Sequence, residues 1–180
     1  MTFDDVLAKY RHLAFSERDK GDRFERLMQA YLLTDPKYTS ELKEVWLWND
    51  FFGRNDFGGS DTGIDLVAET TAGEYWAIQC KFFAEGSLID KPAVDSFLAT
   101  SARSFRNRSM QTTRFVQRLW ISTTNNWGRN AEEALHNQTP PVARLNLHNL
   151  REAPVDWEKL DKGVTGEPAR TQKKRLRHHQ

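Results

Sequence analysis

Two N-terminal segments of the chain carry apolar residues at helical spacing. Over residues 3–14, one helix face gathers Phe3, Val6, Leu7, Tyr10 and Leu13. From Phe24 onward, positions i, i+3, i+4, i+7 and i+8 are again apolar. This second pattern stops near Pro36, because proline disfavours helical geometry in the residue before it. The two patterns predict two amphipathic helices that each turn one face toward a core.

The segments that follow alternate between extended and helical patterns. Runs rich in aromatic and β-branched residues predict strands at 44–52, 64–69, 75–83, 118–124 and 142–147. The Thr71-Ala-Gly sequence predicts a hairpin turn between the second and third strands. Helices are expected at 91–106 and 131–137. This order predicts a mixed α/β domain with a central mixed β-sheet flanked by helices.

Periodicity fades after about Trp157, and the chain ends in a basic segment. We therefore expect one domain over residues 1–157, followed by a linker-like, basic segment over 158–180. No run approaches the roughly 20 apolar residues of a membrane helix, and no secretory signal is visible at the N-terminus. We expect no membrane partner.

Composition narrows the class of protein. The 180 residues are 38% hydrophobic and 28% charged, which excludes a disordered chain and matches a globular domain. The single cysteine, Cys80, excludes an internal disulfide framework and a cysteine-based zinc site. A reducing, cytoplasmic setting is the simplest expectation.

Charge is distributed unevenly along the chain. The segment 96–131 holds six arginines and neither lysine nor acidic residues, so it carries +6 in a chain whose net charge is +1. Such asymmetry is typical of a surface that meets an anionic partner, most often nucleic acid. The predicted phosphate contacts are Arg103, Arg106, Arg108 and Arg114. A solvated loop, or a docking surface for another domain, would explain the same run.

The chemistry-bearing pattern is Asp65, then Gln79-Cys80-Lys81 fourteen residues later. Side chains alternate along a strand, so Gln79 and Lys81 share one face while Ile78 and Cys80 turn to the core. Lysine is almost never fully buried without a partner. A hairpin would bring Asp65 close to Gln79 and Lys81. An ion pair between Asp65 and Lys81 across the hairpin is the purely structural explanation.

The functional explanation is a metal site. A carboxylate, an amide carbonyl and a backbone carbonyl, here that of Cys80, are hard oxygen ligands suited to Mg²⁺. A bound water made more acidic by the ion can attack a phosphodiester. Lys81 would orient that water or stabilise charge developing on the phosphate. Other phosphoryl chemistry would use the same groups, so the spacing alone does not name the substrate.

A resemblance to a known family indicates which substrate this would be. Gly63-Ile-Asp65-Leu, a hairpin and Gln79-Cys-Lys81 resemble the Mrr-like branch of the PD-(D/E)xK nuclease superfamily, in which Gln replaces an acidic residue. The segments 21–27 and 121–126 resemble the branch's first helix and later strand. Sequences such as 73–81 are also similar to the N-terminal nuclease domains of type ISP enzymes, which are single-polypeptide, ATP-dependent restriction–modification enzymes. The chain departs from the superfamily pattern in having Ile64 where a proline is usual.

This resemblance implies a restriction-endonuclease-like fold, a bacterial cytoplasmic protein and a role for each matching residue. Asp65 would be the central metal ligand, Gln79 the second ligand and Lys81 the catalytic lysine, while Glu25 would assist from the first helix. Glu25 would otherwise be an exposed helix residue. Asp61 would be a turn residue or an outer partner of the metal ligands.

The resemblance also implies cofactors and partners. The cofactor would be Mg²⁺, with Mn²⁺ as a substitute, and the substrate would be double-stranded DNA. A helicase-like motor, whose start would lie within 158–180, would follow in the same polypeptide, together with methyltransferase and target-recognition domains. ATP would serve only this motor, since this chain has no Walker-type motif. The alternative function is a catalytically inactive DNA-binding or regulatory module.

Aromatic residues in the predicted first strand suggest two different roles. Trp46, Trp48, Phe51 and Phe52 have the flat surfaces needed to stack on nucleic-acid bases. Aromatic residues in a strand are more often part of the core, which is the interpretation we favour.

Overall fold

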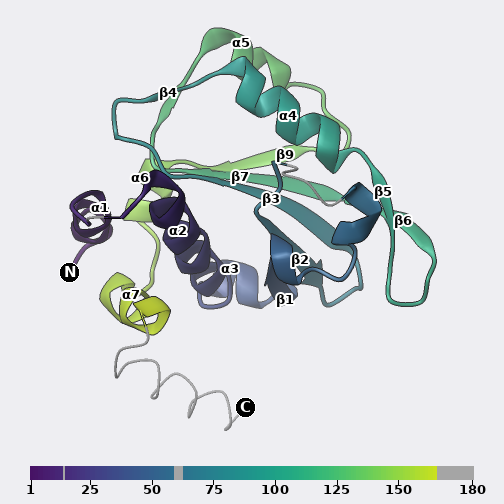
Figure 1. Ribbon diagram of the computed structural model, residues 1–180, viewed down its shortest axis with the longest axis horizontal. Coiled ribbons are helices and arrows are strands. Elements are labelled where there is room, and N and C mark those ends of the chain that lie inside the picture. Colours follow the sequence, from purple (N-terminus) through teal and green to yellow (C-terminus); the bar gives the residue numbers. More distant parts are fainter. Residues whose placement is uncertain (14, 59–62, 166–180) are drawn as a thin grey trace, which may run out of the picture.

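A five-stranded mixed sheet forms the centre of the computed structural model, which describes residues 1–13, 15–58 and 63–165 (Figure 1). The strand order is β1-β2-β3-β7-β9. β1 and β3 both pair with β2 in antiparallel fashion, whereas β7 pairs in parallel with β3 and β9. The strands of the sheet are β1 (Leu42–Leu47), β2 (Leu66–Thr70), β3 (Tyr75–Lys81), β7 (Gln117–Ser122) and β9 (Val142–Leu145). This architecture confirms the predicted α/β class and central mixed sheet.

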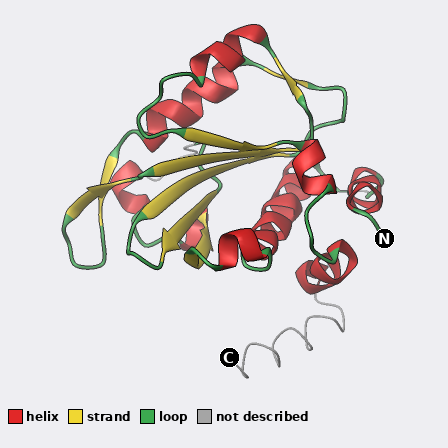
Figure 2. Ribbon diagram, turned by 180° about the vertical axis from the view of Figure 1, so that it is seen from behind, coloured by secondary structure: helices red, strands yellow, loops and turns green. Residues whose placement is uncertain are grey.

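Helices cover both faces of the sheet. Figure 1 shows α4 and α5 on one side and α2 and α3 on the other, and Figure 2 shows the same layers from behind. The helices are α1 (Phe3–Arg11), α2 (Glu17–Leu32), α3 (Pro36–Thr39), α4 (Lys91–Ser101), α5 (Arg129–Ala134), α6 (Leu147–Arg151) and α7 (Trp157–Thr165). Two short 3₁₀ helices, η1 (Trp48–Asp50) and η2 (Arg54–Phe57), separate β1 from β2. Two small two-stranded sheets consist of β4 (Leu88–Ile89) with β8 (Asn126–Trp127), and β5 (Ser104–Arg106) with β6 (Thr112–Arg114).

Strand alternation divides the core in two. Ile78 and Cys80 face the core that contains α1, α2 and α7, whereas Ala77 faces the core beneath α4 and α5. β2 alternates in the same way, because Leu66 belongs to the first core and Val67 to the second. The predicted inward orientation of Ile78 and Cys80 is therefore confirmed, and Gln79 points to the opposite side of the sheet.

Local sequence explains where the first helices begin. Thr2 caps α1 through a hydrogen bond from the Asp5 backbone N–H to its hydroxyl, and the Asp5 carboxylate accepts in turn from the Thr2 backbone N–H, which forms a capping box. Ser16 caps α2 by accepting a hydrogen bond from the backbone N–H of Asp19. α2 therefore starts at Glu17, before the apolar pattern that begins at Phe24, and it ends at Leu32, as the proline signal at Pro36 indicates.

Three expected elements differ from the structure. The expected strand over 44–52 ends at Leu47, because the chain turns into η1 and packs its aromatic rings on the second core. The expected helix over 91–106 ends at Ser101 and continues into the β5–β6 hairpin. Periodicity also extends beyond Trp157: α7 packs against α1 and α2 through Trp157 and Leu160, both 4% exposed. Residues 158–165 therefore form part of the folded domain rather than a linker.

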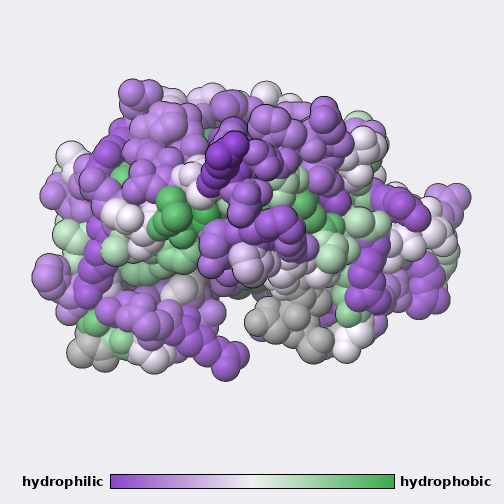
Figure 3. All heavy atoms as spheres, turned by 90° about the horizontal axis from the view of Figure 1, so that it is seen from above, coloured by the Kyte–Doolittle hydropathy of each residue, from purple (hydrophilic) through white to green (hydrophobic). Residues whose placement is uncertain are grey.

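The face of the molecule above α4 and α5 is largely polar (Figure 3). Figure 3 shows that the face over α4 and α5 is mostly hydrophilic, with small separate apolar areas. No helix among the described residues is long and apolar enough to cross a membrane.

Candidate active site

Side chains from three elements meet where β3 ends and β2 begins. Asp65 lies immediately before β2, and its backbone N–H donates to the Ile78 carbonyl over 2.9 Å. Gln79 and Lys81 lie at the end of β3, and Glu25 comes from the middle of α2. The β2–β3 hairpin thus joins residues fourteen positions apart, as the sequence predicts.

The Asp65 carboxylate is held by two donors from β3. Its Oδ2 accepts from Gln79 Nε2 at 2.6 Å and from the Cys80 backbone N–H at 2.8 Å. Gln79 is only 3% exposed, so its amide is a fixed part of the site. The predicted approach of Asp65 to Gln79 is confirmed.

Glu25 reaches the same carboxylate from α2. The apolar residues Phe24, Leu27 and Met28 bury the inner face of α2, and Glu25 lies on its flank. Burial is the largest cause that raises the pKa of Glu25 to about 8; the charges of Asp65 and Asp22 and a hydrogen bond to Asp65 add to it, while Lys81 opposes the shift. Two carboxyl groups this close hold a proton between them unless a cation neutralises the pair.

Cys80 contributes its backbone rather than its thiol. Its side chain lies in the first core, where burial raises the pKa of the thiol well above its ordinary value. A thiol of this kind stays protonated and unreactive. The Cys80 backbone, in contrast, lies beside the Asp65 carboxylate.

The donor set fits a hard divalent cation. Asp65 and Glu25 supply carboxylates and Cys80 a backbone carbonyl. Gln79 would supply its amide oxygen once the amide turns over, since its nitrogen faces Asp65 in the metal-free structure. No group of three or more His, Cys, Asp or Glu side chains suited to a metal occurs among the described residues. The set here would combine two acidic side chains with neutral oxygens, and the mutual repulsion of its carboxylates favours a cation between them.

A glycine packs α4 closely against this site. Gly63 has a φ of +76°, and a Cβ added there would lie 3.2 Å from Ser96 Oγ and 3.7 Å from Gln79 Oε1. Any larger residue would be strained in this backbone conformation and crowded by α4. Ser96 on α4 is the neighbour of the site that sequence reasoning missed, because nothing in the local pattern distinguishes it. Asp61 lies outside the described residues.

The arginine segment lies at the other end of the sheet. Arg103, Arg106, Arg108 and Arg114 belong to the β5–β6 hairpin or its entrance, not to a helix. Phe105 on β5 packs on Tyr75, the first residue of β3, with ring centroids 5.3 Å apart. Lys81 lies six positions after Tyr75 along β3, which corresponds to about 20 Å. The structure therefore does not bring these arginines to the Asp65 site.

Three of the four arginines are used within the protein. Arg106 pairs with Asp56 at 3.0 Å. Arg108 pairs with Glu44 at 2.9 Å and lies over the rings of Trp46 and Phe52. Arg103 donates to the Phe57 carbonyl at 3.2 Å and lies over the ring of that residue. Arg114 is exposed on β6, and contact of any of the four with DNA stays a prediction.

The aromatic residues after β1 mainly pack inward. Phe51 is 2% exposed and belongs to the second core, with Trp46 and Trp48 packed against it. Phe52 is more open, at 38% exposed. The interpretation that these aromatic residues belong to the core is confirmed for Phe51 and for Trp46 and Trp48, which pack against it.

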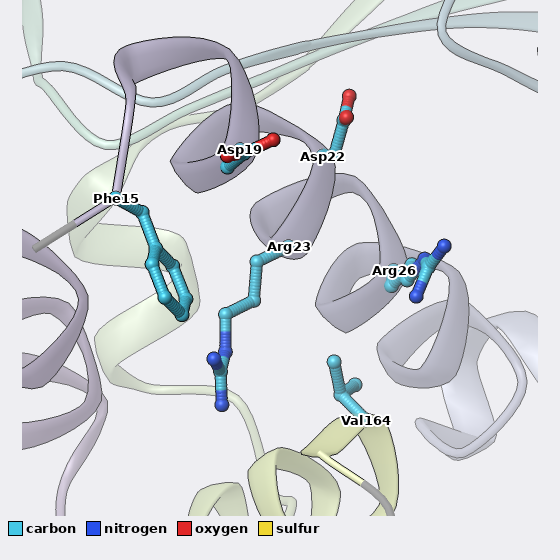
Figure 4. Close-up of a pocket in the computed structure, with 6 residues that line it drawn as sticks. All are labelled: Phe15, Asp19, Asp22, Arg23, Arg26 and Val164. Carbon is cyan, nitrogen blue, oxygen red and sulfur yellow. The ribbon is translucent and has the colours of Figure 1, made fainter. Parts of the chain in front are cut away.

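A surface pocket of about 390 Å³ lies elsewhere, between α2 and the end of α7 (Figure 4). Figure 4 shows Arg23 extending into it between Phe15 and Val164. None of the predicted site residues lines this pocket. It is therefore not the candidate active site itself, although its lining includes Asp22, whose charge helps to raise the pKa of Glu25.

Comparison with known proteins identifies the family of this chain. A family model described as a restriction endonuclease, Mrr_cat_2, matches residues 33–167. The DNA-bound ATP-dependent Type ISP restriction-modification enzyme LlaBIII is similar in structure, with a TM-score of 0.66 and 27% identity over 88% of this chain. This chain spans only 9% of the LlaBIII chain. A search of curated proteins finds no match.

Two further structures share the fold. The MspJI restriction endonuclease in complex with a 27-mer oligonucleotide has a TM-score of 0.54 and 17% identity, over 91% of this chain and 34% of that chain. The DNA modification-dependent restriction endonuclease AspBHI has a TM-score of 0.51 and 13% identity, over 91% of this chain and 39% of that chain.

Proposed function

Since this chain belongs to the restriction endonuclease family, we propose that it hydrolyses DNA phosphodiester bonds with a divalent cation held by Asp65, Glu25 and Gln79. The cation would be Mg²⁺, with Mn²⁺ as a substitute, and the Cys80 carbonyl would complete the protein ligands. The observation that carries the proposal is that Glu25 and Asp65 meet beside the buried amide of Gln79. Gln79 is followed in β3 by Cys80, whose backbone N–H also donates to Asp65, and by Lys81.

The residues of this chain have separable tasks in that reaction. A bound divalent cation would supply Lewis acidity toward the phosphodiester and lower the pKa of a water molecule. Asp65 is preorganised for its role because Gln79 and the Cys80 N–H fix its carboxylate. Glu25 would give up its shared proton as it becomes a ligand. Lys81 would orient the attacking water or stabilise the negative charge that develops on the phosphate.

The similarity to LlaBIII suggests the larger setting. We infer that this chain acts as the cleavage module of an ATP-dependent restriction–modification enzyme that acts against foreign double-stranded DNA. Helicase-like, methyltransferase and target-recognition domains of the same polypeptide would supply translocation and sequence choice. ATP would be bound only by the motor.

Plasmid cleavage tests the proposal. Supercoiled DNA is incubated with the wild-type chain, Asp65→Ala and the control Asp95→Ala, in Mg²⁺, Mn²⁺ or EDTA. Asp95 is an exposed α4 residue that pairs with Lys91 on the same helix, so its loss leaves the site untouched. We expect metal-dependent nicking by the wild type and the control, and none by Asp65→Ala.

Two other outcomes have defined meanings. Undiminished nicking by Asp65→Ala would refute the proposed site. Absence of cleavage by all three proteins would move the assay to the full-length polypeptide with ATP. If the full-length wild type is also inactive there, the alternative of a non-catalytic DNA-binding module replaces the proposal.

A further inference from the structure

Two adjacent threonines form hydrogen bonds with the backbone of the loop that follows Lys81. Residues 82–87 connect β3 to β4 without strand pairing of their own. Thr123 and Thr124 come directly after β7, the parallel neighbour of β3, and both are fully buried. We call this pair the threonine clamp. Because Lys81 lies opposite Ser122 in the β3–β7 register, the clamp begins level with the end of β3.

Thr123 holds the backbone on both sides of Phe82. Its backbone N–H donates to the Lys81 carbonyl at 3.2 Å. Its hydroxyl accepts from the Phe83 N–H and donates to the Phe83 carbonyl, each at 2.6 Å. The side chain thus replaces the strand pairing that β3 loses after Lys81.

Thr124 continues the contact along the same loop. Its Oγ1 lies 2.9 Å from the Glu85 carbonyl oxygen and 2.7 Å from that of Ser87, so a single hydroxyl proton is shared between them. Arg11 of α1 reinforces the loop by donating to the Phe83 carbonyl at 2.7 Å. Side chains from α1 and from the segment after β7 therefore hold this loop by hydrogen bonds.

The clamp contacts the Lys81 side of the site and not its carboxylate side. The hydroxyl bonds described above end on the backbone of residues 83–87. The proposed ligands of the cation are Asp65, Gln79, Glu25 and the Cys80 carbonyl, and none of these hydroxyl bonds involves them. A buried hydroxyl is costly unless it is hydrogen-bonded, so these two residues are suited to fixing backbone rather than to filling space. A substitution in the threonine clamp should therefore change the position of the Lys81 ammonium group and leave the metal ligands in place.

We propose that Thr123 is a positioning residue that fixes the Lys81 ammonium for phosphodiester cleavage, with Thr124 holding the following loop. This inference rests on the proposed nuclease function. Thr123→Val keeps the shape of the side chain and removes its hydroxyl. We expect the single-turnover cleavage rate to fall at least about 10-fold, since small misplacements of a catalytic group cost up to about 100-fold. Mn²⁺ affinity, measured by titration calorimetry, should stay within about twofold because its ligands are untouched.

Two control variants separate positioning from general stability. Thr123→Ser retains the hydroxyl and should restore the rate. Thr70→Val removes a comparably buried threonine hydroxyl that accepts from the Glu74 N–H at the far end of β2. It should lower the denaturation midpoint without lowering the cleavage rate. A wild-type rate in Thr123→Val, or an equal loss in Thr70→Val, would overturn the proposal.

A measurement without cleavage makes the test independent of activity. Lysines of the full chain are labelled as ¹³C-dimethyllysine, and the Lys81 resonance is assigned with Lys81→Arg. Thr123→Val should shift that resonance and Thr70→Val should not. An unmoved Lys81 resonance would overturn the positioning role, whereas an inactive wild type with a shifted resonance would count against the nuclease function alone.

Discussion

Replacing Glu25 by glutamine should have opposite effects on stability and on metal binding. In the metal-free protein Glu25 shares a hydrogen bond with Asp65, and its pKa is raised to about 8, first by burial and then by the neighbouring carboxylates. Glutamine has the shape of the protonated carboxyl group and can donate to Asp65 in the same way. Glu25→Gln therefore removes a charge that the metal-free fold disfavours and keeps the contact that it favours.

The sign of the pH effect follows from proton linkage. The folded chain holds the Glu25 proton more tightly than the unfolded chain, in which this carboxyl group has its ordinary pKa of 4.5. The stability of the wild type should therefore fall as the pH rises from about 4.5 to about 8, and level off above that. Glu25→Gln lacks this decline, so the difference between the two proteins should grow over the same interval.

The magnitude is limited by solvent around the site. A tenfold change in proton affinity corresponds to about 1.4 kcal/mol, which sets an upper limit of about 5 kcal/mol for the full shift. Glu25 is only partly buried, and solvent screening of such a group reduces this considerably. We expect Glu25→Gln to be more stable than the wild type by about 1–2 kcal/mol at pH 8.5 in EDTA.

Urea denaturation at pH 5.5 and pH 8.5 measures this difference, with the exposed Glu152→Gln as the control. Adding Mn²⁺ should then raise the stability of the wild type more than that of Glu25→Gln, because a ligand stabilises the state that binds it. A variant that is destabilised equally at both pH values would show that Glu25 does not experience the Asp65 charge. A variant that gains as much from Mn²⁺ as the wild type would remove Glu25 from the metal ligands.

Three further changes test separate parts of the structure. Lys81→Ala should abolish cleavage and keep Mn²⁺ and DNA binding; a normal rate in the nicking assay would remove its catalytic role. Trp157→Ala should cost about 3–5 kcal/mol in urea unfolding, typical of a buried aromatic residue, because Trp157 stacks on Tyr31 at 5.2 Å; a loss under about 1 kcal/mol would contradict the packing of α7. Arg114→Ala should lower the salt dependence of DNA binding by about one ion if it contacts a phosphate, and an unchanged slope would exclude that contact.

Much of the fold follows from local pattern. The helical stripes of α1 and α2 and the alternation in β2 and β3 are predictable because burial on one face imposes its period on the sequence. The hairpin turn is predictable because Gly73 takes a φ of +81°, which few other residues tolerate. These elements also fix which side chains of β3 face the core.

The boundaries that differ from the prediction have a tertiary cause. Residues 48–52 have the aromatic content of a strand, yet residues 48–50 form η1, and the rings of Trp48 and Phe51 pack in the second core. The β5–β6 hairpin has helix-compatible residues at its start, and its form is stabilised by Arg106 pairing with Asp56, which is fifty positions away. α7 is stabilised by Asp161, which is 1% exposed and bonded to Lys9 and Tyr10 of α1. No local window contains such partners.

The candidate site likewise has residues that local sequence predicts and contacts that only tertiary packing creates. Local pattern is enough to single out Asp65, Gln79 and Lys81, because they are polar interruptions of apolar strands and a hairpin must bring them together. Three other features emerge only from packing: Glu25 shares its proton with Asp65, Thr123 binds the backbone beside Lys81, and the arginine hairpin lies at the opposite end of the sheet. The physical reason is range: strand and helix periods act over a few residues, whereas these contacts depend on how α2, β3 and β7 pack across the whole domain.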